Sequence, residues 1–377
     1  MPITTRVITV LAIVVVATTI TYLALTSLAP PTTVTSPTTT SATASVSSPT
    51  TPTISQIQLR WGTASAGTTS YQVLGLIADL VSKYLPGYEI IVMPTASSTA
   101  STKLYANEEL DGCYAGNAIM YEVHTGTGRF AGFVPKRLPV HTFWAYEHEV
   151  TIAILRENLG KYKCWSSLNG SKVFLGKSDW DMHVALRAAL EALGIRVEHV
   201  ELETSMVADA LQRGIIVATM IPTTSGVTTS PWVKELELAV PLAILNPCPN
   251  EIELLKVKAK EIGVFAYAED YADPRNIFVT NIMLSAGDKM SGIKVIYGFH
   301  TGSELPEEVV YRILKVLDEH SDELVKMYSG FALLKEKFAE FQAECIDSLP
   351  TVPVHPGLAR FLKEKGVWRS EWKIVEG

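Results

Sequence analysis

The chain has 377 residues, with 32 Lys and Arg against 39 Asp and Glu, so its formal net charge at pH 7 is -7. Nucleic-acid binding needs a basic stripe that follows the phosphates, and the sequence shows none, so we exclude that class of function. The length is sufficient for two lobes that each bury a hydrophobic core.

The N-terminus carries an uncharged, almost wholly apolar run over residues 7–29. A helix of about 20 apolar residues spans the hydrocarbon core of a bilayer, whereas the apolar core of a cleaved signal peptide usually has about 7 to 15 residues. We therefore expect residues 1–29 to form a single retained transmembrane helix that anchors the chain in the cell membrane. A long cleaved signal peptide is the alternative.

Residues 30–56 consist almost entirely of Thr, Ser, Pro, Ala and Val. Such a segment lacks the large apolar side chains that offset chain entropy, and its composition is typical of disordered, often O-glycosylated stalks. The globular module from residue 57 onward is therefore expected on the extracellular or periplasmic side of the membrane.

The first part of the module alternates strands with helices. A strand at 57–62 leads through a hydroxyl-rich loop at 63–70 into a helix at 71–84, which Pro86 and Gly87 end. A strand at 89–93, a helix at 101–109, a strand edge at 113–114 and a helix at 117–124 follow. This alternation indicates an α/β lobe with parallel strands.

The pattern repeats further along the chain. We expect strands at 149–155, 172–175, 198–202 and 215–220, with helices at 181–193 and 205–213, which together make a second α/β lobe. A loop at 222–231, a helix at 252–260, a strand at 278–284, a long helical stretch at 306–343 and a final helix at 356–365 complete the prediction.

The chain has four cysteines, Cys113, Cys164, Cys248 and Cys345. They show no Cys-x-x-Cys spacing, so we expect no metal site, and no motif indicates a cofactor. Outside the cell, cysteines can form disulfides. The sequence also lacks a Gly-x-Ser-x-Gly elbow, a His-Glu-x-x-His pair and a P-loop, so we expect no catalytic residues.

Four segments of the module resemble the TAXI family, the extracytoplasmic solute receptors of one branch of the tripartite ATP-independent periplasmic (TRAP) transporters. They are WGTASAGTTSY at 61–71 with LPG at 85–87, ELDG at 109–112 with GTG at 126–128, SLNGSKV at 167–173, and VPVHPGLARFLKEKG at 352–366. The last segment is the most specific. The segments follow the family's order over essentially the whole module.

The resemblance implies a two-lobe type II periplasmic-binding-protein fold with the ligand in the cleft between the lobes. Such a chain crosses between lobes twice, which places lobe one at 57–147 and 283–377 and lobe two at 148–282. This division favours two disulfides, Cys164 with Cys248 and Cys113 with Cys345, because each bond then lies within one lobe.

The implied function is capture of a small polar solute, an amino acid or carboxylate-like compound, by lobe closure. The receptor would deliver the solute to a TRAP-type integral membrane permease and perform no chemistry on it. A binding protein of an ATP-driven importer, or a sensor of similar fold, is the alternative. A surface hydrolase or a structural envelope module is a third class.

Ligand-binding residues are expected in loops at the carboxyl ends of strands, where helix amino termini point into the crevice. In lobe one, the hydroxyl-rich loop can bind an acceptor-rich ligand or can be an ordinary capping turn. The candidates in this lobe are Thr63, Ser65, Thr68, Thr69, Tyr71 and Asn117.

In lobe two, the candidates are Ser178, Asp179 and Trp180 in one turn and Thr223 and Thr224 in the loop after a strand. Asp179 or Asp181 either caps the following helix or points into the cleft, where it would favour an amine or a cation. Trp180 either stacks on the ligand or packs within the lobe. The loop that carries Thr223 and Thr224 is either part of the site or a solvated surface loop. His355 is expected in a turn where its imidazole satisfies nearby backbone groups.

Overall fold

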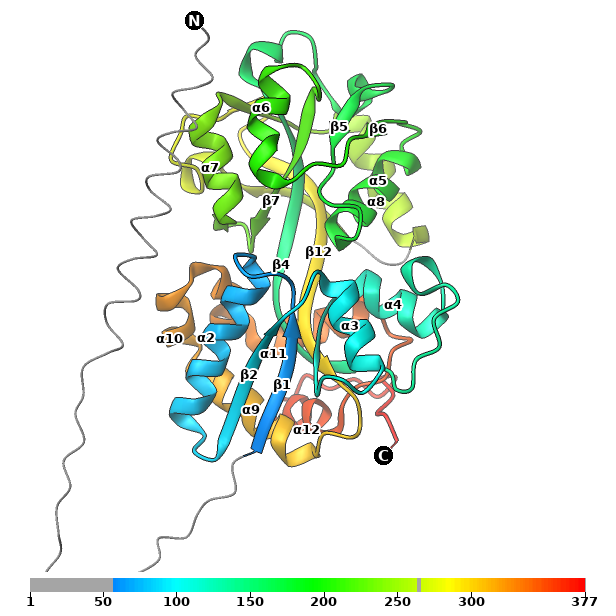
Figure 1. Ribbon diagram of the computed structural model, residues 1–377, viewed down its shortest axis with the longest axis vertical. Coiled ribbons are helices and arrows are strands. Elements are labelled where there is room, and N and C mark those ends of the chain that lie inside the picture. The colour runs from blue at the N-terminus through cyan, green and yellow to red at the C-terminus, as the bar shows by residue number, and fades with distance from the viewer. Residues whose placement is uncertain (1–56, 263–265, 377) are drawn as a thin grey trace, which may run out of the picture. The chain divides into compact units, whose positions relative to one another are not determined.

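The computed structural model describes residues 57–262 and 266–376 (Figure 1). The expected membrane anchor and stalk, over residues 1–56, lie outside the described residues. Within the described ranges, no helix combines the length and the hydropathy that a membrane span requires.

The described chain folds into the expected two α/β lobes (Figure 1). The N-terminal part of lobe one contains β1 (Ile57–Thr63), α2 (Thr69–Tyr84), β2 (Tyr88–Pro94), α3 (Ser98–Ala106), β3 (Cys113–Gly116) and α4 (Asn117–Thr125). Its C-terminal part contains α9 (Glu307–Glu319), α10 (Ser321–Met327), η6 (Ser329–Phe331), α11 (Ala332–Ser348) and α12 (Pro356–Glu364). β1 pairs with β2 in parallel, as α/β connections require.

Lobe two is one continuous stretch of chain. It contains β5 (Lys172–Phe174), α5 (Asp181–Ala192), β6 (Glu198–His199), η4 (Thr204–Met206), α6 (Val207–Gln212), β7 (Ala218–Thr224), β8 (Thr228–Thr229), α7 (Pro231–Ala239), β9 (Leu242–Leu245), α8 (Pro249–Ile262), β10 (Ala266–Ala272) and β11 (Met283–Leu284). β11 pairs with β9, so the chain is still within lobe two at this point.

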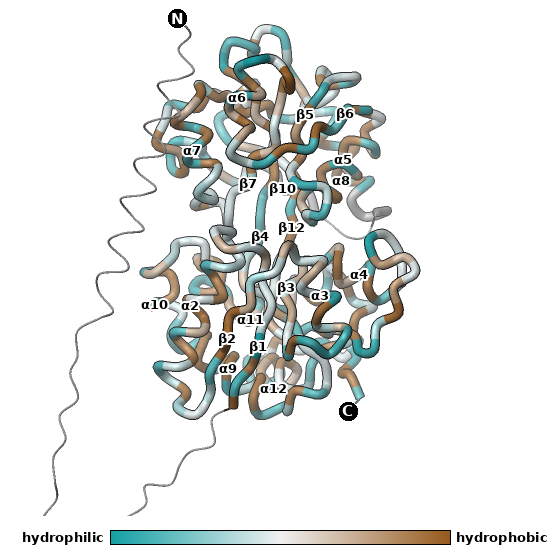
Figure 2. The backbone as a smooth tube through the Cα atoms, in the orientation of Figure 1, coloured by the Kyte–Doolittle hydropathy of each residue, from teal (hydrophilic) through white to brown (hydrophobic). Residues whose placement is uncertain are grey.

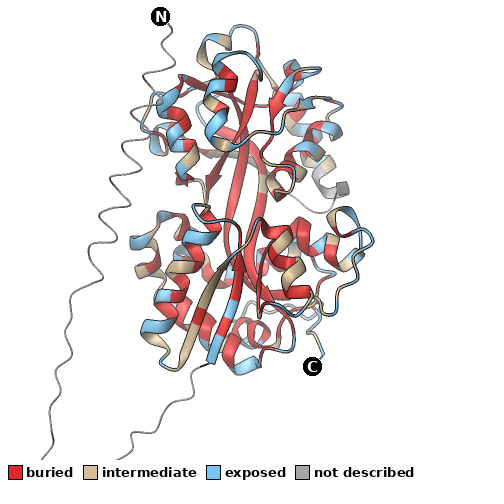
Figure 3. Cartoon of the chain, viewed as in Figure 1, coloured by how far each residue is buried: buried red, intermediate tan, exposed pale blue. Residues whose placement is uncertain are grey.

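Two long antiparallel strands, β4 (Val140–Leu155) and β12 (Met290–Thr301), run through both lobes (Figure 1). In lobe one, β3 pairs with β12, and in lobe two, β7 and β9 pair with β4. Figure 3 shows both strands buried along almost their whole length. These two strands are therefore the connection between the lobes.

The sequence prediction missed β12 and began β4 at residue 149. Gly292 and Gly298 weaken the strand pattern of β12, but the structure shows why small residues stand there. A Cβ at Gly292 would lie 2.2 Å from the Val150 carbonyl oxygen, and a Cβ at Gly298 would lie 2.3 Å from that of Phe143. Glycine at both positions lets β12 approach the backbone of β4 closely.

Other predicted elements need correction. The helical stretch expected at 306–343 is divided into α9, α10, η6 and α11, and the strand expected at 278–284 is reduced to the two residues of β11. α7, β9 and β10 were not expected. Figure 2 shows polar and apolar residues alternating along the helices, and this periodicity is what made most of them predictable.

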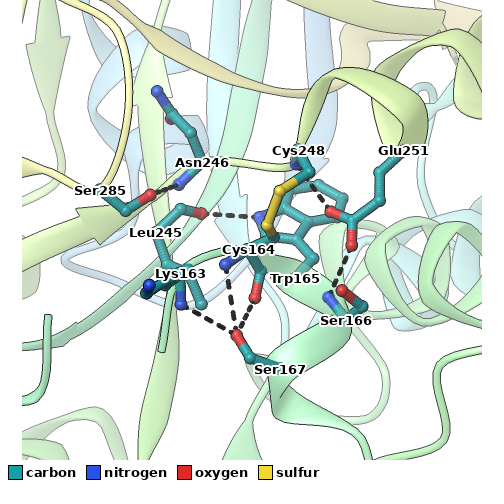
Figure 4. Close-up of a disulfide and its surroundings, with 10 residues drawn as sticks. All are labelled: Lys163, Cys164, Trp165, Ser166, Ser167, Leu245, Asn246, Cys248, Glu251 and Ser285. Carbon is teal, nitrogen blue, oxygen red and sulfur yellow. Dashed lines mark hydrogen bonds between the residues drawn. A yellow bond between two sulfur atoms is a disulfide. The ribbon is translucent and has the colours of Figure 1, made fainter. Parts of the chain in front are cut away.

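One of the two expected disulfides is present (Figure 4). Cys164 and Cys248 are bonded, with their Cα atoms 5.2 Å apart. The predicted pairing of Cys113 with Cys345 is wrong, because both are free, buried thiols. Cys113 packs in a small cluster with Tyr105 and Leu110, whereas Cys345 belongs to the main core of the protein.

The prediction for His355 is confirmed. It is the N-cap of α12, and its Nδ1 accepts a hydrogen bond from the Gly357 backbone N–H at 3.0 Å. Its Nε2 lies 2.9 Å from the Leu305 carbonyl oxygen. The buried imidazole therefore satisfies two backbone groups and has a structural role.

Candidate functional site

A cleft of about 260 Å³ lies between the lobes. Its walls come from the loop before α2 and the start of α3 in lobe one, and from the starts of α5 and α7 and η4 in lobe two. Residues of β3, β4 and β12 form its floor. Both lobes and both crossing strands thus contribute to one cavity.

The lobe-one wall is the hydroxyl-rich loop that leads into α2. Thr68 is the N-cap of this helix: its hydroxyl accepts from the Tyr71 backbone N–H and donates to the Ser65 carbonyl at 2.7 Å. In the described part of the chain, the backbone N–H groups of Ala66, Gly67 and Thr69 find no acceptor. Such groups at the amino end of a helix are suited to an anionic or acceptor-rich ligand.

The lobe-two wall contains Trp180, the N-cap of α5, and Trp232, in the first turn of α7. Both indole rings are only partly buried. Ser230, the N-cap of α7, also lines the cleft, and within the described residues its buried hydroxyl oxygen has no hydrogen-bond partner. This wall therefore offers two aromatic faces and one unsatisfied polar group.

The floor is a cluster of three tyrosines, Tyr114, Tyr146 and Tyr297, which we call the tyrosine floor. The Tyr114 and Tyr297 rings stack with centroids 5.3 Å apart, and the Tyr146 and Tyr297 rings stack at 5.7 Å. The hydroxyl oxygens of Tyr114 and Tyr146 lie 2.7 Å apart and share a hydrogen bond. All three side chains are at least nine-tenths buried.

His148 lies beside the tyrosine floor on β4. Its Nδ1 is 2.9 Å from the Thr223 carbonyl oxygen, so this nitrogen carries the proton of the neutral ring. Burial lowers the pKa of His148 to about 4, against the opposing effect of the Thr223 carbonyl. At neutral pH the ring is therefore uncharged, and its Nε2 is an acceptor.

Three charged side chains line the cleft, and each has a partner within the protein. Lys177 pairs with Glu203, with Nζ 2.7 Å from Oε2. Asp181 pairs with Arg129 of lobe one, with Oδ1 2.5 Å from Nη1. The cleft is therefore close to electrically neutral apart from its helix amino termini.

The Asp181 contact joins the lobes, and we call Asp181, Arg129 and Gly116 the interlobe latch. The Gly116 backbone N–H donates to Asp181 Oδ2 at 3.1 Å. Within lobe one, Arg129 also pairs with Glu122, with Nε 2.7 Å from Oε2. Burial raises the pKa of Asp181, whereas Arg129 lowers it, and the short separation favours the ionised pair. A Cβ at Gly116 would lie 2.3 Å from Asp181 Oδ2, so the contact requires glycine.

A second interlobe contact lies on another side of the cleft. The Ser225 hydroxyl of lobe two donates to the Gly330 carbonyl of lobe one at 2.7 Å. The nearby Tyr328 hydroxyl interacts with the hydroxyls of Thr69 and Thr224, one from each lobe. With both contacts formed, the described conformation has its lobes closed.

The structure brings four of the expected ligand-binding residues to the cleft wall: Ser65, Thr68, Thr69 and Trp180. Thr63 supports the same loop from within, because its hydroxyl donates to the Ser70 hydroxyl at 2.9 Å. Tyr71 is 37% exposed and does not line the cavity, and Asn117 is buried at the start of α4.

The remaining expected residues lie near the cleft without lining it. The Ser178 hydroxyl donates to Glu201, and the Asp179 main-chain carbonyl accepts from Thr99 Oγ1 at 3.4 Å. Thr223 donates to Glu149 at 2.8 Å, and the Thr224 hydroxyl lies 3.2 Å from His148 Nδ1. The hydroxyls of Ser178, Thr223 and Thr224 thus interact with side chains of lobe two, and Asp179 contributes its main-chain carbonyl.

Several cleft residues were not anticipated from the sequence: Tyr114, Tyr146, His148, Lys177, Ser230, Trp232 and Tyr297. Two signals could have found some of them. Tyr146 and His148 are two residues apart, which puts them on the same face of a strand. Ser230 followed by Pro231 is a typical helix start and would have located Trp232 at a helix amino terminus.

No group of three or more His, Cys, Asp or Glu side chains that could hold a metal ion occurs among residues 57–262 and 266–376.

A family model described as "NMT1-like family" matches residues 61–366. Among solved structures, the chain is similar to a putative L-cystine ABC transporter from Listeria monocytogenes, with 12% identity, coverage of 73% of this chain and 95% of that chain, and a TM-score of 0.42. It is also similar to the periplasmic aliphatic sulphonate binding protein SsuA from Escherichia coli, with 14% identity, coverage of 82% and 91%, and a TM-score of 0.44.

Proposed function

Because the chain belongs to the NMT1-like family, which its match over residues 61–366 shows, we propose that it is a receptor that captures a small polar solute between its lobes. Membership of this family of periplasmic solute-binding proteins supports a solute-binding role with the globular part outside the cytoplasm, and it fits a protein that performs no chemistry on its solute. The expected solute is an amino acid or a carboxylate-like compound. The observation that carries the proposal is the cleft built from both lobes and both crossing strands.

Capture by lobe closure is supported by the two interlobe contacts. Neither the interlobe latch nor the contact of Ser225 with Gly330 could survive separation of the lobes. A solute that binds residues of both lobes stabilises the closed state, because it binds that state better than the open one. The open state then admits and releases the solute.

A screen of amino acids, mono- and dicarboxylates and amines by thermal shift tests this function. A true ligand at a hundredfold excess over its Kd stabilises the folded state by about 2.7 kcal/mol. Small-angle X-ray scattering with and without that ligand should show a smaller radius of gyration in its presence. A protein that no solute stabilises or closes is not a solute receptor.

We further propose that residues 7–29 anchor the receptor in the membrane and that it delivers its solute to a TRAP-type permease. The apolar run supports the anchor, and the four segments that resemble TAXI receptors support the partner. Membrane fractionation of the full-length protein tests the anchor. Cross-linking in native membranes followed by mass spectrometry tests the partner: linkage to a TRAP-type permease supports it, and linkage to an ATP-driven importer contradicts it.

A further inference from the structure

We propose that the cleft selects a ligand with a single carboxylate or similar oxyanion on a flat, unsaturated ring, in preference to aliphatic dicarboxylates and amines. This inference rests on the proposed function, since it names the class of solute that the same cleft would bind. It is carried by three features of the cleft: its unsatisfied donors, its paired charges and its aromatic surfaces.

The unsatisfied donors define a place for one oxyanion. Within the described residues, the Ala66 and Gly67 backbone N–H groups of lobe one have no acceptor in the protein, and both residues are exposed in the loop before the 16-residue helix α2, where a ligand can reach them. From lobe two, the Ser230 hydroxyl is buried without a partner at the start of the nine-residue helix α7. Both helix amino termini carry partial positive charge, so an oxyanion bound to these donors is stabilised by both lobes.

The paired charges leave no place for a second ionic group. Lys177 is held by Glu203 and Asp181 by Arg129, so neither a second carboxylate nor an ammonium group meets an unpaired counter-ion on the cleft wall. An ion that is buried without such a partner loses its hydration without compensation. A ligand with one negative charge avoids this cost.

The aromatic surfaces favour a flat ring. Trp180 and Trp232 are partly exposed at the cleft wall. In the tyrosine floor, the Tyr114 and Tyr146 hydroxyls bond to each other, and the Tyr297 hydroxyl interacts with the Met182 backbone. Because the three tyrosines are at least nine-tenths buried, Trp180 and Trp232 supply most of the aromatic surface open to a ligand, and this surface is suited to stacking or edge-to-face contact with a ring.

Isothermal titration of the full-length protein with four related probes tests the proposal. Phenylacetate has one carboxylate and an aromatic ring, cyclohexylacetate has the same charge on a saturated ring, phenethylamine has the opposite charge, and succinate has two carboxylates and no ring. We expect phenylacetate to bind at least tenfold more tightly than succinate or phenethylamine, and more tightly than cyclohexylacetate.

Two variants with matched controls test the two groups proposed to contact the ligand, the Ser230 hydroxyl and the Trp232 ring. Ser230→Ala should weaken phenylacetate binding about tenfold, whereas Ser303→Ala, at an exposed serine outside the cleft, should not. Trp232→Leu should weaken phenylacetate more than cyclohexylacetate. Trp368→Leu should affect neither, because Trp368 lies edge to face with Trp372 and does not line the cleft. Near-native melting temperatures establish that each variant is folded.

The outcomes separate this inference from the proposed function. If succinate, glutamate or phenethylamine binds as tightly as phenylacetate, the ligand class is wrong and the receptor function stands. If phenylacetate binds but neither Ser230→Ala nor Trp232→Leu weakens it, the assigned donors and ring surface are wrong. If no probe or screened solute binds and scattering detects no closure, both the receptor function and its ligand class are contradicted.

Discussion

Glu149 is a buried carboxylic acid in β4, where the chain passes from one lobe to the other. Its Oε2 accepts hydrogen bonds from the Thr223 hydroxyl at 2.8 Å and the Gly226 backbone N–H at 2.9 Å. Burial and the neighbouring Glu147 raise the pKa of Glu149 to about 8, against the effect of these two donors. The side chain is therefore mostly protonated at neutral pH.

This shift predicts how stability depends on pH. From the ordinary pKa of 4.5 up to about 8, the folded chain keeps a proton on Glu149 that the unfolded chain has released. The contribution of Glu149 to the free energy of unfolding is therefore fully present below pH 4.5 and is lost as the pH rises through this window. Glu149→Gln, which mimics the protonated acid, should be more stable than the wild type at pH 8 by about 1 to 3 kcal/mol.

Urea denaturation at pH 5 and pH 8 measures this effect. The matched control is Glu198→Gln, which removes an exposed carboxylate from β6 in the same sheet. Equal pH dependence in Glu149→Gln and the wild type would show that Glu149 does not retain its proton in the folded state.

Trp180 is the expected site residue whose ring the structure places at the cleft wall, whereas Tyr71 and Asp179 do not line the cavity. We expect Trp180→Ala to weaken the best solute from the screen by about 1 to 3 kcal/mol, because a contact face is lost. Tyr71→Ala and Asp179→Asn should leave the affinity within about twofold. Calorimetry on the three folded variants provides the measurement, and a large loss for Tyr71→Ala would place the ligand outside this cleft.

Among the elements, those with a clear period could be predicted and those with interrupted patterns could not. α5 and α2 have regular apolar spacing, and the structure forms both close to their expected bounds. β12 contains Gly292 and Gly298, which interrupt its strand pattern. Glycine is needed at both positions because the backbone of β4, which is far away in the sequence, lies too close for a Cβ. Local propensity contains no information on that contact.

The candidate site was predictable at the level of loops but less so at the level of side chains. The loop before α2 and the turn before α5 both reach the cleft, as the family resemblance implied. Which side chain faces the cavity depends on tertiary packing: Tyr71 turns outward, while Tyr297 enters from a strand that the sequence did not reveal. Asp181 acts on the other lobe, a role that spacing alone does not show.

The Cys164–Cys248 disulfide ties the segment before β5 to the start of α8, across a sequence separation of 84 residues. Glu251 supports the same junction, because its carboxylate accepts from the Ser166 and Cys248 backbone N–H groups (Figure 4). Replacing both cysteines with serine should lower the free energy of unfolding by about 2 to 4 kcal/mol, since the unfolded chain gains freedom.

Denaturation of the double variant, with and without reductant, tests the disulfide's contribution. The matched control is the double variant Cys113→Ser, Cys345→Ser, which replaces the two free thiols and keeps the disulfide. Reductant should therefore destabilise this control as it does the wild type. Thiol titration of the unreduced native chain should count two free cysteines only after unfolding, because both are buried. Four reactive thiols would contradict the bond.

At the scale of the whole globular unit, we predict that the interlobe latch stabilises the closed arrangement of the lobes. Arg129 does not line the cleft, so Arg129→Ala removes a closing contact without changing the cavity wall. Asp181 would then be buried without its counter-ion in the closed state, which favours opening. We expect a larger radius of gyration without solute, and about tenfold weaker binding, because the binding-competent state is less populated.

The matched control for this prediction is Arg369→Ala. Arg369 pairs with Asp347 at 2.7 Å entirely within lobe one, so its loss should change neither closure nor affinity. X-ray scattering and calorimetry on both variants compare the Arg129–Asp181 pair between the lobes with the Arg369–Asp347 pair within lobe one. If Arg129→Ala binds solute like the wild type and scatters like it, the latch does not contribute to closure.

The two crossing strands also determine the order in which the chain can fold during synthesis. Lobe two is one continuous stretch between β4 and β12, so it becomes complete as soon as β12 has emerged. Lobe one must wait for α9, α10, α11 and α12, because their apolar faces complete its core. Until then, the face of β4 that α11 covers and the face of α2 that α9 covers stay open to water. We therefore expect lobe two to fold first, with the N-terminal half of lobe one as the segment most in need of protection from aggregation.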